Sequence, residues 1–369
     1  MNNDVEKKKY RYGFPILLFV YHLIFTFVAY QYYLKNSGDA QLYWFLKQNQ
    51  NLSSWGDYFA IGSDFVLFLN YPFAIIGGFP ILFGFLFYSF IGYVAIINLY
   101  TWSLQWIPNP PQFFGISVLQ LIVFMPNLHF WTAGLGKESL ILLALIFIFQ
   151  AITSKAFFSL KFFLGVFLLV MIRPHVAFFL LLALLLYFVF WNSKEILKKK
   201  LLAMFIAVPV VTGLLYSVLQ LTQIRYWDWE RIKKFNNYSL QSFQHADSYV
   251  PMVDYSLFEK VFAFNFRPLF FDASSLMTVG ISFENVLVLI ILISTIGMSF
   301  TYYKKIQLNV VSKIIVIFAL VSCLFYIQRY ACLGIFLRTK VMYMPFLLIV
   351  CVYLYSQIRT IKDKQTNKL

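Results

Sequence analysis

The chain has 369 residues, of which 61% are hydrophobic and 12% are charged, and its formal net charge is +15. A soluble domain of this length carries roughly twice that charged fraction, so the composition excludes an ordinary soluble protein. The basic runs are short and lie directly beside apolar segments. They therefore indicate orientation in a membrane and contact with anionic lipid, and not nucleic-acid binding.

Apolar segments long enough, or nearly long enough, to cross a hydrocarbon core of about 30 Å recur along the chain. We predict an all-α, polytopic integral membrane protein with about ten transmembrane helices and both termini in the cytoplasm. The expected spans are residues 13–34, 79–102, 113–126, 139–154, 162–171, 176–191, 201–222, 282–302, 308–328 and 341–357. Residues 65–76 are too short to span comfortably and are expected to be re-entrant or interfacial.

The chain is expected to form a single membrane domain, 1–369, with outer loops at 35–64 and 223–275. The first loop is rich in aromatic residues, which favours a segment at the membrane interface, and the second is amphipathic enough for one or two surface helices. The third span is expected to stop at Pro126, before an outer turn. Pro174 disfavours helix at Arg173, so a break is predicted between two apolar segments there.

Two groups of basic residues fall on the predicted outer side, against the usual bias towards the cytoplasm. Arg173 and His175 flank Pro174, and Arg329, Arg338 and Lys340 surround the turn before the last span. These residues either anchor the protein at the outer interface or bind a phosphate or diphosphate, for which a guanidinium offers a planar fork of donors.

Four more charged residues lie at predicted outer membrane edges, where a charge needs a partner or a function. Glu138 follows Lys137 at the start of a span, so it can complement the helix N-terminus and pair with the lysine. Arg267 lies between aromatic residues and is either an interfacial anchor or an anion ligand. Glu284 lies near the outer end of a span and is expected to be protonated or paired with an arginine.

Asp39 is the acidic candidate for catalysis. It follows the first span in a Gly38-Asp39 turn, with Tyr43 and Trp44 nearby. A carboxylate there is either a turn aspartate or a general base that accepts the proton of a sugar hydroxyl. The four histidines and three cysteines are scattered without ligand spacing, so no metal site and no cofactor are indicated. The motifs of P-loop nucleotide-binding proteins and of Ser-His hydrolases are not present in the sequence.

An aspartate in the first outer loop resembles the start of GT-C membrane glycosyltransferases, which use polyprenyl-phosphate sugars. The stretches FWTAGLGKESL, MIRPHVAFF, FRPLFF, SFEN and LGIFLRTKVMYMPFLL resemble Wzy-type polymerases and EpsG-like proteins of bacterial surface-polysaccharide clusters. The resemblance implies that outer arginines, here Arg173 and either Arg338 or Arg329, hold a lipid diphosphate. Many GT-C enzymes carry an acidic pair where the Gly38-Asp39-Ala40 turn has a single aspartate, which leaves open whether the chain is a transferase or a polymerase.

The leading hypothesis is a glycosyltransferase or polysaccharide polymerase in the bacterial inner membrane. It would use a polyprenyl-phosphate- or polyprenyl-diphosphate-linked glycan at the outer face of that membrane. A transporter or flippase of a lipid-linked or anionic substrate is the first alternative, and it predicts inverted repeats and charges near the bilayer midplane. A non-catalytic subunit of an envelope assembly complex is the second, and it predicts that Asp39 and Arg173 tolerate substitution.

Overall fold

The fold is that of a computed structural model, and it describes residues 2–46, 54–107, 109–191 and 228–366, together with residues 205, 209, 212, 213 and 216. The predicted span 201–222 and the basic run at 198–200 lie outside these ranges, apart from the isolated residues just named. The described chain is all-helical, with one small two-stranded sheet, as the composition predicts. Its contacts divide it into two compact units, Met1–Pro174 and His175–Leu369, where the sequence predicts one membrane domain.

Unit 1 consists of helices and one short β-hairpin. Its α-helices are α1 (Asn2–Asn36), α2 (Asp39–Trp44), α3 (Ser63–Tyr71), α4 (Ile81–Trp106), α5 (Val118–Val123), α6 (Pro126–Ala133), α7 (Glu138–Ser154) and α8 (Leu160–Ile172). The 3-10 helix η1 (Trp55–Tyr58) precedes α3, the π-helix η2 (Pro72–Ile76) follows it, and strands β1 (Gln112–Phe113) and β2 (Ile116–Ser117) form the hairpin.

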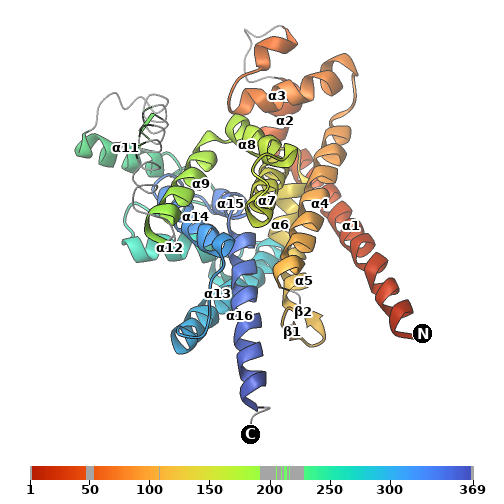
Figure 1. Cartoon of the computed structure of the whole chain (residues 1–369). Coiled ribbons are helices and arrows are strands. Elements are labelled where there is room, and N and C mark those ends of the chain that lie inside the picture. The colour runs from red at the N-terminus through yellow and green to blue at the C-terminus, as the bar shows by residue number, and fades with distance from the viewer. Residues whose placement is uncertain are drawn as a thin grey trace. The chain divides into compact units, whose positions relative to one another are not determined.

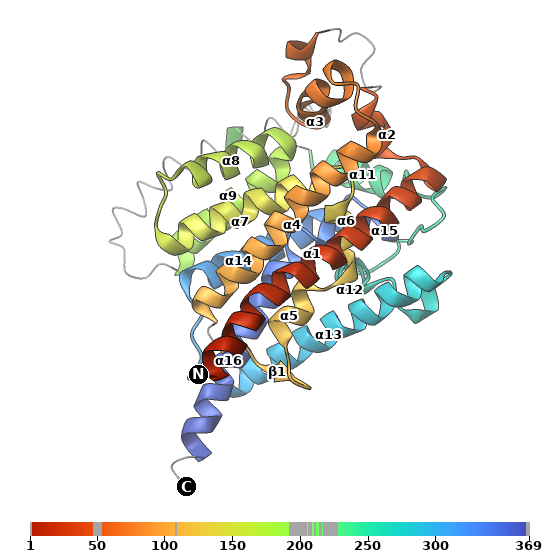
Figure 2. The ribbon, with the colours of Figure 1, turned by 90° about the vertical axis from the view of Figure 1, so that its right-hand side faces the viewer.

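Helix α4 organises unit 1, because it packs against α1, α6 and α7, and α7 in turn packs against α8. Helices α2 and α3 lie at the end of the unit where α4 begins, and the β1–β2 hairpin lies near the other end (Figure 1, Figure 2). Small residues permit the close contacts. A Cβ on Gly92 would lie 2.2 Å from the Thr132 carbonyl oxygen, and one on Gly165 would lie 2.8 Å from that of Ala144.

Unit 2 begins with α9 (Pro174–Leu186), whose first residue belongs to unit 1, and the π-helix η3 (Tyr187–Trp191). Its further elements are α11 (Trp229–Gln241), α12 (Leu257–Phe266), the 3-10 helix η4 (Phe270–Asp272), α13 (Leu276–Tyr302), α14 (Val310–Tyr326), α15 (Leu333–Lys340) and α16 (Met344–Thr366). Helix α16 packs against α13 and α14, and α12 packs against α13, α14 and α15.

Side-chain caps explain where several helices of unit 2 begin. Ser256 Oγ accepts from Glu259 N at the start of α12, and Ser275 Oγ accepts from Thr278 N at the start of α13. Asn309 Oδ1 accepts from Ser312 N at the start of α14. Such caps satisfy backbone donors that have no partner inside the helix.

Five helical segments of the described residues are long and apolar enough to cross a membrane: Gly13–Asn36, Ile81–Trp106, Pro174–Trp191, Leu276–Tyr302 and Met344–Asp363. Shorter apolar helical segments cover Ser63–Ile76, Val118–Ala133, Glu138–Ser154, Leu160–Ile172 and Val310–Tyr326. Large apolar side chains on α13, at Ile290, Ile293 and Ile296, are 56–60% exposed. Such exposed apolar faces are expected where a protein is embedded in a membrane, whereas their exposure to water is unfavourable.

Two predicted boundaries compare directly with the observed ones. Helix α8 ends at Ile172 and α9 begins at Pro174, so the predicted break at Arg173 is confirmed. The third predicted span is wrong in detail, because residues 113–126 form the hairpin and α5, and residues 126–133 form α6 where an outer turn was expected. Pro126 does not end a helix; it occupies the first turn of α6, where the missing N–H costs nothing.

Candidate functional site

The Arg173 cluster, defined as Tyr43, Ser63, Lys137, Glu138 and Arg173, lies in unit 1. Its centre is an ion pair in which Arg173 Nη2 donates to Glu138 Oε1 over 2.7 Å. The two side chains are 10% and 3% exposed. Each of these charges would be uncompensated if its partner were absent, and an uncompensated buried charge is strongly destabilising. The hydrogen-bonded ion pair compensates both charges.

Chain geometry brings the two charges together. Helices α7 and α8 form an antiparallel hairpin, so the first residue of α7, Glu138, lies beside the residue that follows α8, Arg173. Glu138 also stands at a helix N-terminus, where the exposed amides favour a carboxylate. The sequence predicted Lys137 and Arg173 as separate candidates, and the structure brings both to the same end of this hairpin.

Lys137 links the hairpin to the first outer loop. Its Nζ donates to Ser63 Oγ over 2.8 Å, at the start of α3, and lies 5.6 Å from the centre of the Tyr43 ring on α2. The Gly62 amide donates to the Met171 carbonyl over 2.7 Å, which ties the same loop to α8. Tyr43, Gly62 and Ser63 of the loop 35–64 therefore contact the end of the hairpin that carries the two cations.

Asp39 is the first residue of α2 and is exposed. Tyr43 follows it by one helical turn, which places both side chains on the same face of α2. Asn70 fixes this helix, because its Nδ2 donates to the Tyr43 carbonyl over 3.1 Å while its Oδ1 accepts from Tyr88 over 2.9 Å. The structure thus puts Asp39 on the short helix that contacts Lys137.

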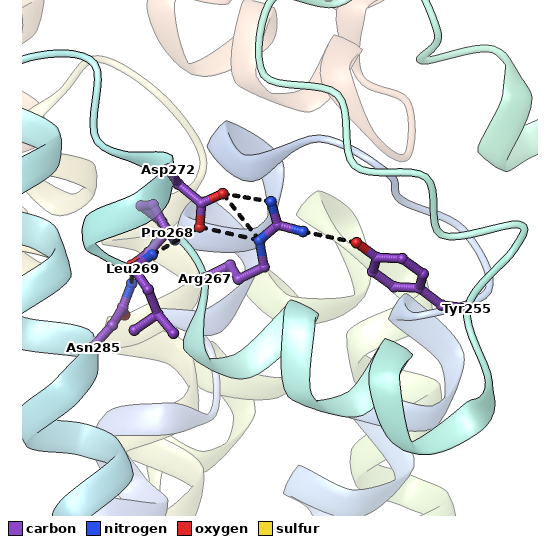
Figure 3. Close-up of polar contacts among 6 residues, drawn as sticks. All are labelled: Tyr255, Arg267, Pro268, Leu269, Asp272 and Asn285. Atoms are coloured by element: carbon purple, nitrogen blue, oxygen red, sulfur yellow. Dashed lines mark hydrogen bonds and ion pairs between the residues drawn. The ribbon is translucent and has the colours of Figure 1, made fainter.

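In unit 2, Arg267 belongs to a compact polar loop (Figure 3). Its Nε donates to Asp272 Oδ2 over 3.0 Å, its Nη2 donates to Asp272 Oδ1, and its Nη1 donates to Tyr255 over 3.1 Å. The hydrogen bonds from Arg267 to Asp272 raise the pKa of the guanidinium further. The Arg267–Pro268 peptide bond is cis, and Asn285 Nδ2 donates to the Pro268 carbonyl over 2.8 Å.

Lys340 lies in the interior of unit 2. Its Nζ donates to the Asn265 carbonyl over 3.0 Å and to Asn285 Oδ1 over 2.9 Å, and the residue is 4% exposed. Burial lowers the pKa of Lys340, and the charge of Glu284 opposes this effect. Asn285 therefore joins the Lys340 ammonium to the loop of Arg267. The predicted site residues Arg267, Glu284 and Lys340 belong to one polar network in unit 2.

The other predicted residues of unit 2 have different surroundings. The Arg329 guanidinium lies 4.4 Å from the centre of the Phe235 ring, and its buried Nη1 has no hydrogen-bond partner among the described residues. Burial lowers the pKa of Arg329, which nevertheless stays charged. The His175 ring packs against Phe179 and Tyr326, and Arg338 is half-buried on α15.

Sequence reasoning did not select several polar partners of these sites, namely Ser63, Tyr255, Asn265, Asp272 and Asn285. Asp272 was the easiest to find, because it follows Arg267 by five residues and a charge at a membrane edge needs a partner. The asparagines gave no comparable signal, since the sequence does not show which group a single amide side chain in an apolar helix binds. Lys137 and Ser63 are 74 residues apart, and no local pattern pairs them.

An open pocket of about 460 Å³ lies in unit 2, and none of the polar residues described above lines it. It is lined by residues of η3, α13, α14, α16 and the α13–α14 connection, among them Ser299, Gln307 and Lys313. Among the described residues, no group of three or more His, Cys, Asp or Glu side chains is arranged to hold a metal ion. Comparisons with protein-family models, curated proteins and solved structures find no match to this chain.

Proposed function

We propose that the chain is a membrane glycosyltransferase or polysaccharide polymerase that acts on a polyprenyl-phosphate- or polyprenyl-diphosphate-linked glycan. The observation that supports it best is the Arg173 cluster, in which two cations of unit 1 meet the loop that carries Asp39. A phosphate leaving group needs cations, and an acceptor hydroxyl needs a base. The proposed location is the outer face of a bacterial inner membrane.

In the proposed reaction, Asp39 accepts the proton of the acceptor hydroxyl while its oxygen attacks the anomeric carbon of the donor glycan. The bond from that carbon to the phosphate oxygen breaks, and its electron pair stays on the polyprenyl (di)phosphate. Lys137 and Arg173 stabilise the charge that develops on this leaving group. The products are the elongated glycan and the free lipid (di)phosphate.

The test uses the full chain in lipid nanodiscs, supplied with polyprenyl-diphosphate-linked glycan from a bacterial host. Glycan length and released lipid phosphate are followed by mass spectrometry. We expect Asp39→Asn to slow transfer by roughly 10²–10⁴-fold and Lys137→Gln by roughly 10²–10³-fold. The matched controls are Asp64→Asn, in the same outer loop, and Lys161→Gln, at the other end of the hairpin.

Full activity of both site variants would refute the assigned roles. An intact glycan with every variant and the wild type, despite binding of the lipid-linked substrate, would refute the enzyme itself. Movement of that intact substrate across the bilayer would then support the transporter alternative.

A further inference from the structure

Two histidines that are distant in the sequence meet inside unit 1. His22 on α1 is 1% exposed and His129 on α6 is 0% exposed. Their Nδ1 atoms lie 2.8 Å apart, which is a hydrogen-bond distance. His22 lies nine residues after Gly13, where the apolar span of α1 begins, so at 1.5 Å per residue the pair is roughly 14 Å from that end.

The opposite nitrogen of each ring contacts a backbone carbonyl. His22 Nε2 lies 3.0 Å from the Ser89 oxygen on α4, and His129 Nε2 lies 2.7 Å from the Val123 oxygen at the end of α5. A carbonyl oxygen only accepts hydrogen bonds, so each Nε2 must carry a hydrogen to bond there. Four helices thus converge on the two rings.

Counting hydrogens then gives the charge of the pair. A neutral imidazole has one N–H, and in both rings the carbonyl contact uses it. The two Nδ1 atoms would then present lone pairs to each other at 2.8 Å. One additional proton between them turns this repulsion into a hydrogen bond. A metal ion does not fit there, since two nitrogens that each lie about 2.0–2.1 Å from a tetrahedral zinc are more than 3 Å apart.

We infer that His22 and His129 form a binding site for one proton, which the two Nδ1 atoms share. With the proton bound, all four ring nitrogens are hydrogen-bonded and the pair has a charge of +1. Without it, one ring must turn its hydrogen to Nδ1 and lose its bond to Ser89 or Val123. Proton occupancy is therefore coupled to the contacts of α1 with α4 or of α6 with α5.

The surroundings make this site responsive to pH. Tyr21 on α1 contacts the pair, with its ring edge-on to His129 at 4.7 Å and its hydroxyl donating to the Phe124 carbonyl. From α4 the pair meets the Ser89 backbone and Gly92, and neither the Gly13–Asn36 part of α1 nor α4, α5 or α6 contains a carboxylate side chain. Burial of a charge without a counter-charge opposes protonation, while the three hydrogen bonds favour it.

The inference is tested by nitrogen NMR on the full chain in lipid bilayers with ¹⁵N-labelled histidine. The chain has four histidines, so His22→Gln and His129→Gln assign the two signals, and His245→Gln, at an exposed position, is the matched control. We expect a single strongly deshielded proton correlated with both Nδ1 atoms. The signal of this proton should be lost in one titration step as the pH rises. In either site variant it should be absent at every pH.

A spectrum in which both rings stay neutral over the whole stable pH range, with no proton correlated to both Nδ1 atoms, would overturn the inference. Unchanged signals of His22 in the His129→Gln variant would overturn it as well. The wild-type titration decides the question even where a variant does not fold. The outcome is independent of the proposed glycosyl transfer, because no glycan is present in the experiment.

Discussion

At the scale of single residues, the ion pair of Arg173 and Glu138 allows a direct test of its contribution to stability. We expect Arg173→Gln to destabilise the protein by roughly 3–5 kcal/mol, because it removes the guanidinium that pairs with the buried Glu138 carboxylate. The double variant Arg173→Gln with Glu138→Gln should recover most of this loss, since it removes both charges of the pair. Thermal unfolding in lipid measures both. An equal loss of stability in the single and double variants would contradict the assigned role of the ion pair.

Lys340 should give the protein a measurable pH dependence. Burial lowers its pKa in the folded state, so between that value and the unfolded value of about 10.4 the unfolded chain binds more protons. Stability attributable to this residue therefore rises with pH across that window. We expect Lys340→Met to flatten the rise in Tm with pH, and Lys233→Met, on exposed α11, to leave it unchanged. A parallel rise in all three proteins would exclude Lys340 as its source.

At the scale of helices, the contact of α4 with α6 depends on Gly92. A Cβ there would meet the Thr132 carbonyl oxygen at 2.2 Å and His22 Nε2 at 3.0 Å. We expect Gly92→Ala to lower the Tm of the protein, because backbone cannot move aside as a flexible side chain can. Gly280→Ala is the matched control, since nothing lies within 4 Å of its Cβ position on α13. An equal Tm for both variants would contradict this packing.

Helix boundaries were predictable where a residue acts locally, and contacts between helices were not. Pro174 marked the break after α8 through its own missing donor. Pro126 has the same chemistry but starts α6, and only the hairpin and α5 before it reveal which role applies. His22 and His129 are 107 residues apart on different helices. The sequence of each helix does not indicate which other helix it packs against. The contact between the two histidines is therefore visible only in the three-dimensional structure.

At the scale of the whole molecule, the membrane orientation remains a prediction that labelling can check. In a chain with its three cysteines replaced by serine, Ser54→Cys and Ser256→Cys should react with a membrane-impermeant maleimide in intact cells. Lys305→Cys and Arg359→Cys should react only after permeabilisation, as the positive-inside rule predicts. All four positions are exposed, so accessibility within the fold is matched. The reverse labelling pattern would invert the proposed orientation.

The pairing of Glu138 with Arg173 has a consequence for biosynthesis. Insertion of a charged residue into a bilayer from the translocon costs roughly 2.5–3.5 kcal/mol at the middle of a helix and less near its end. Helix α8 has only 13 residues and is followed directly by Arg173, so it is a weak insertion signal alone. In the α7–α8 hairpin the two charges neutralise each other. We therefore expect α7 and α8 to leave the translocon as one unit.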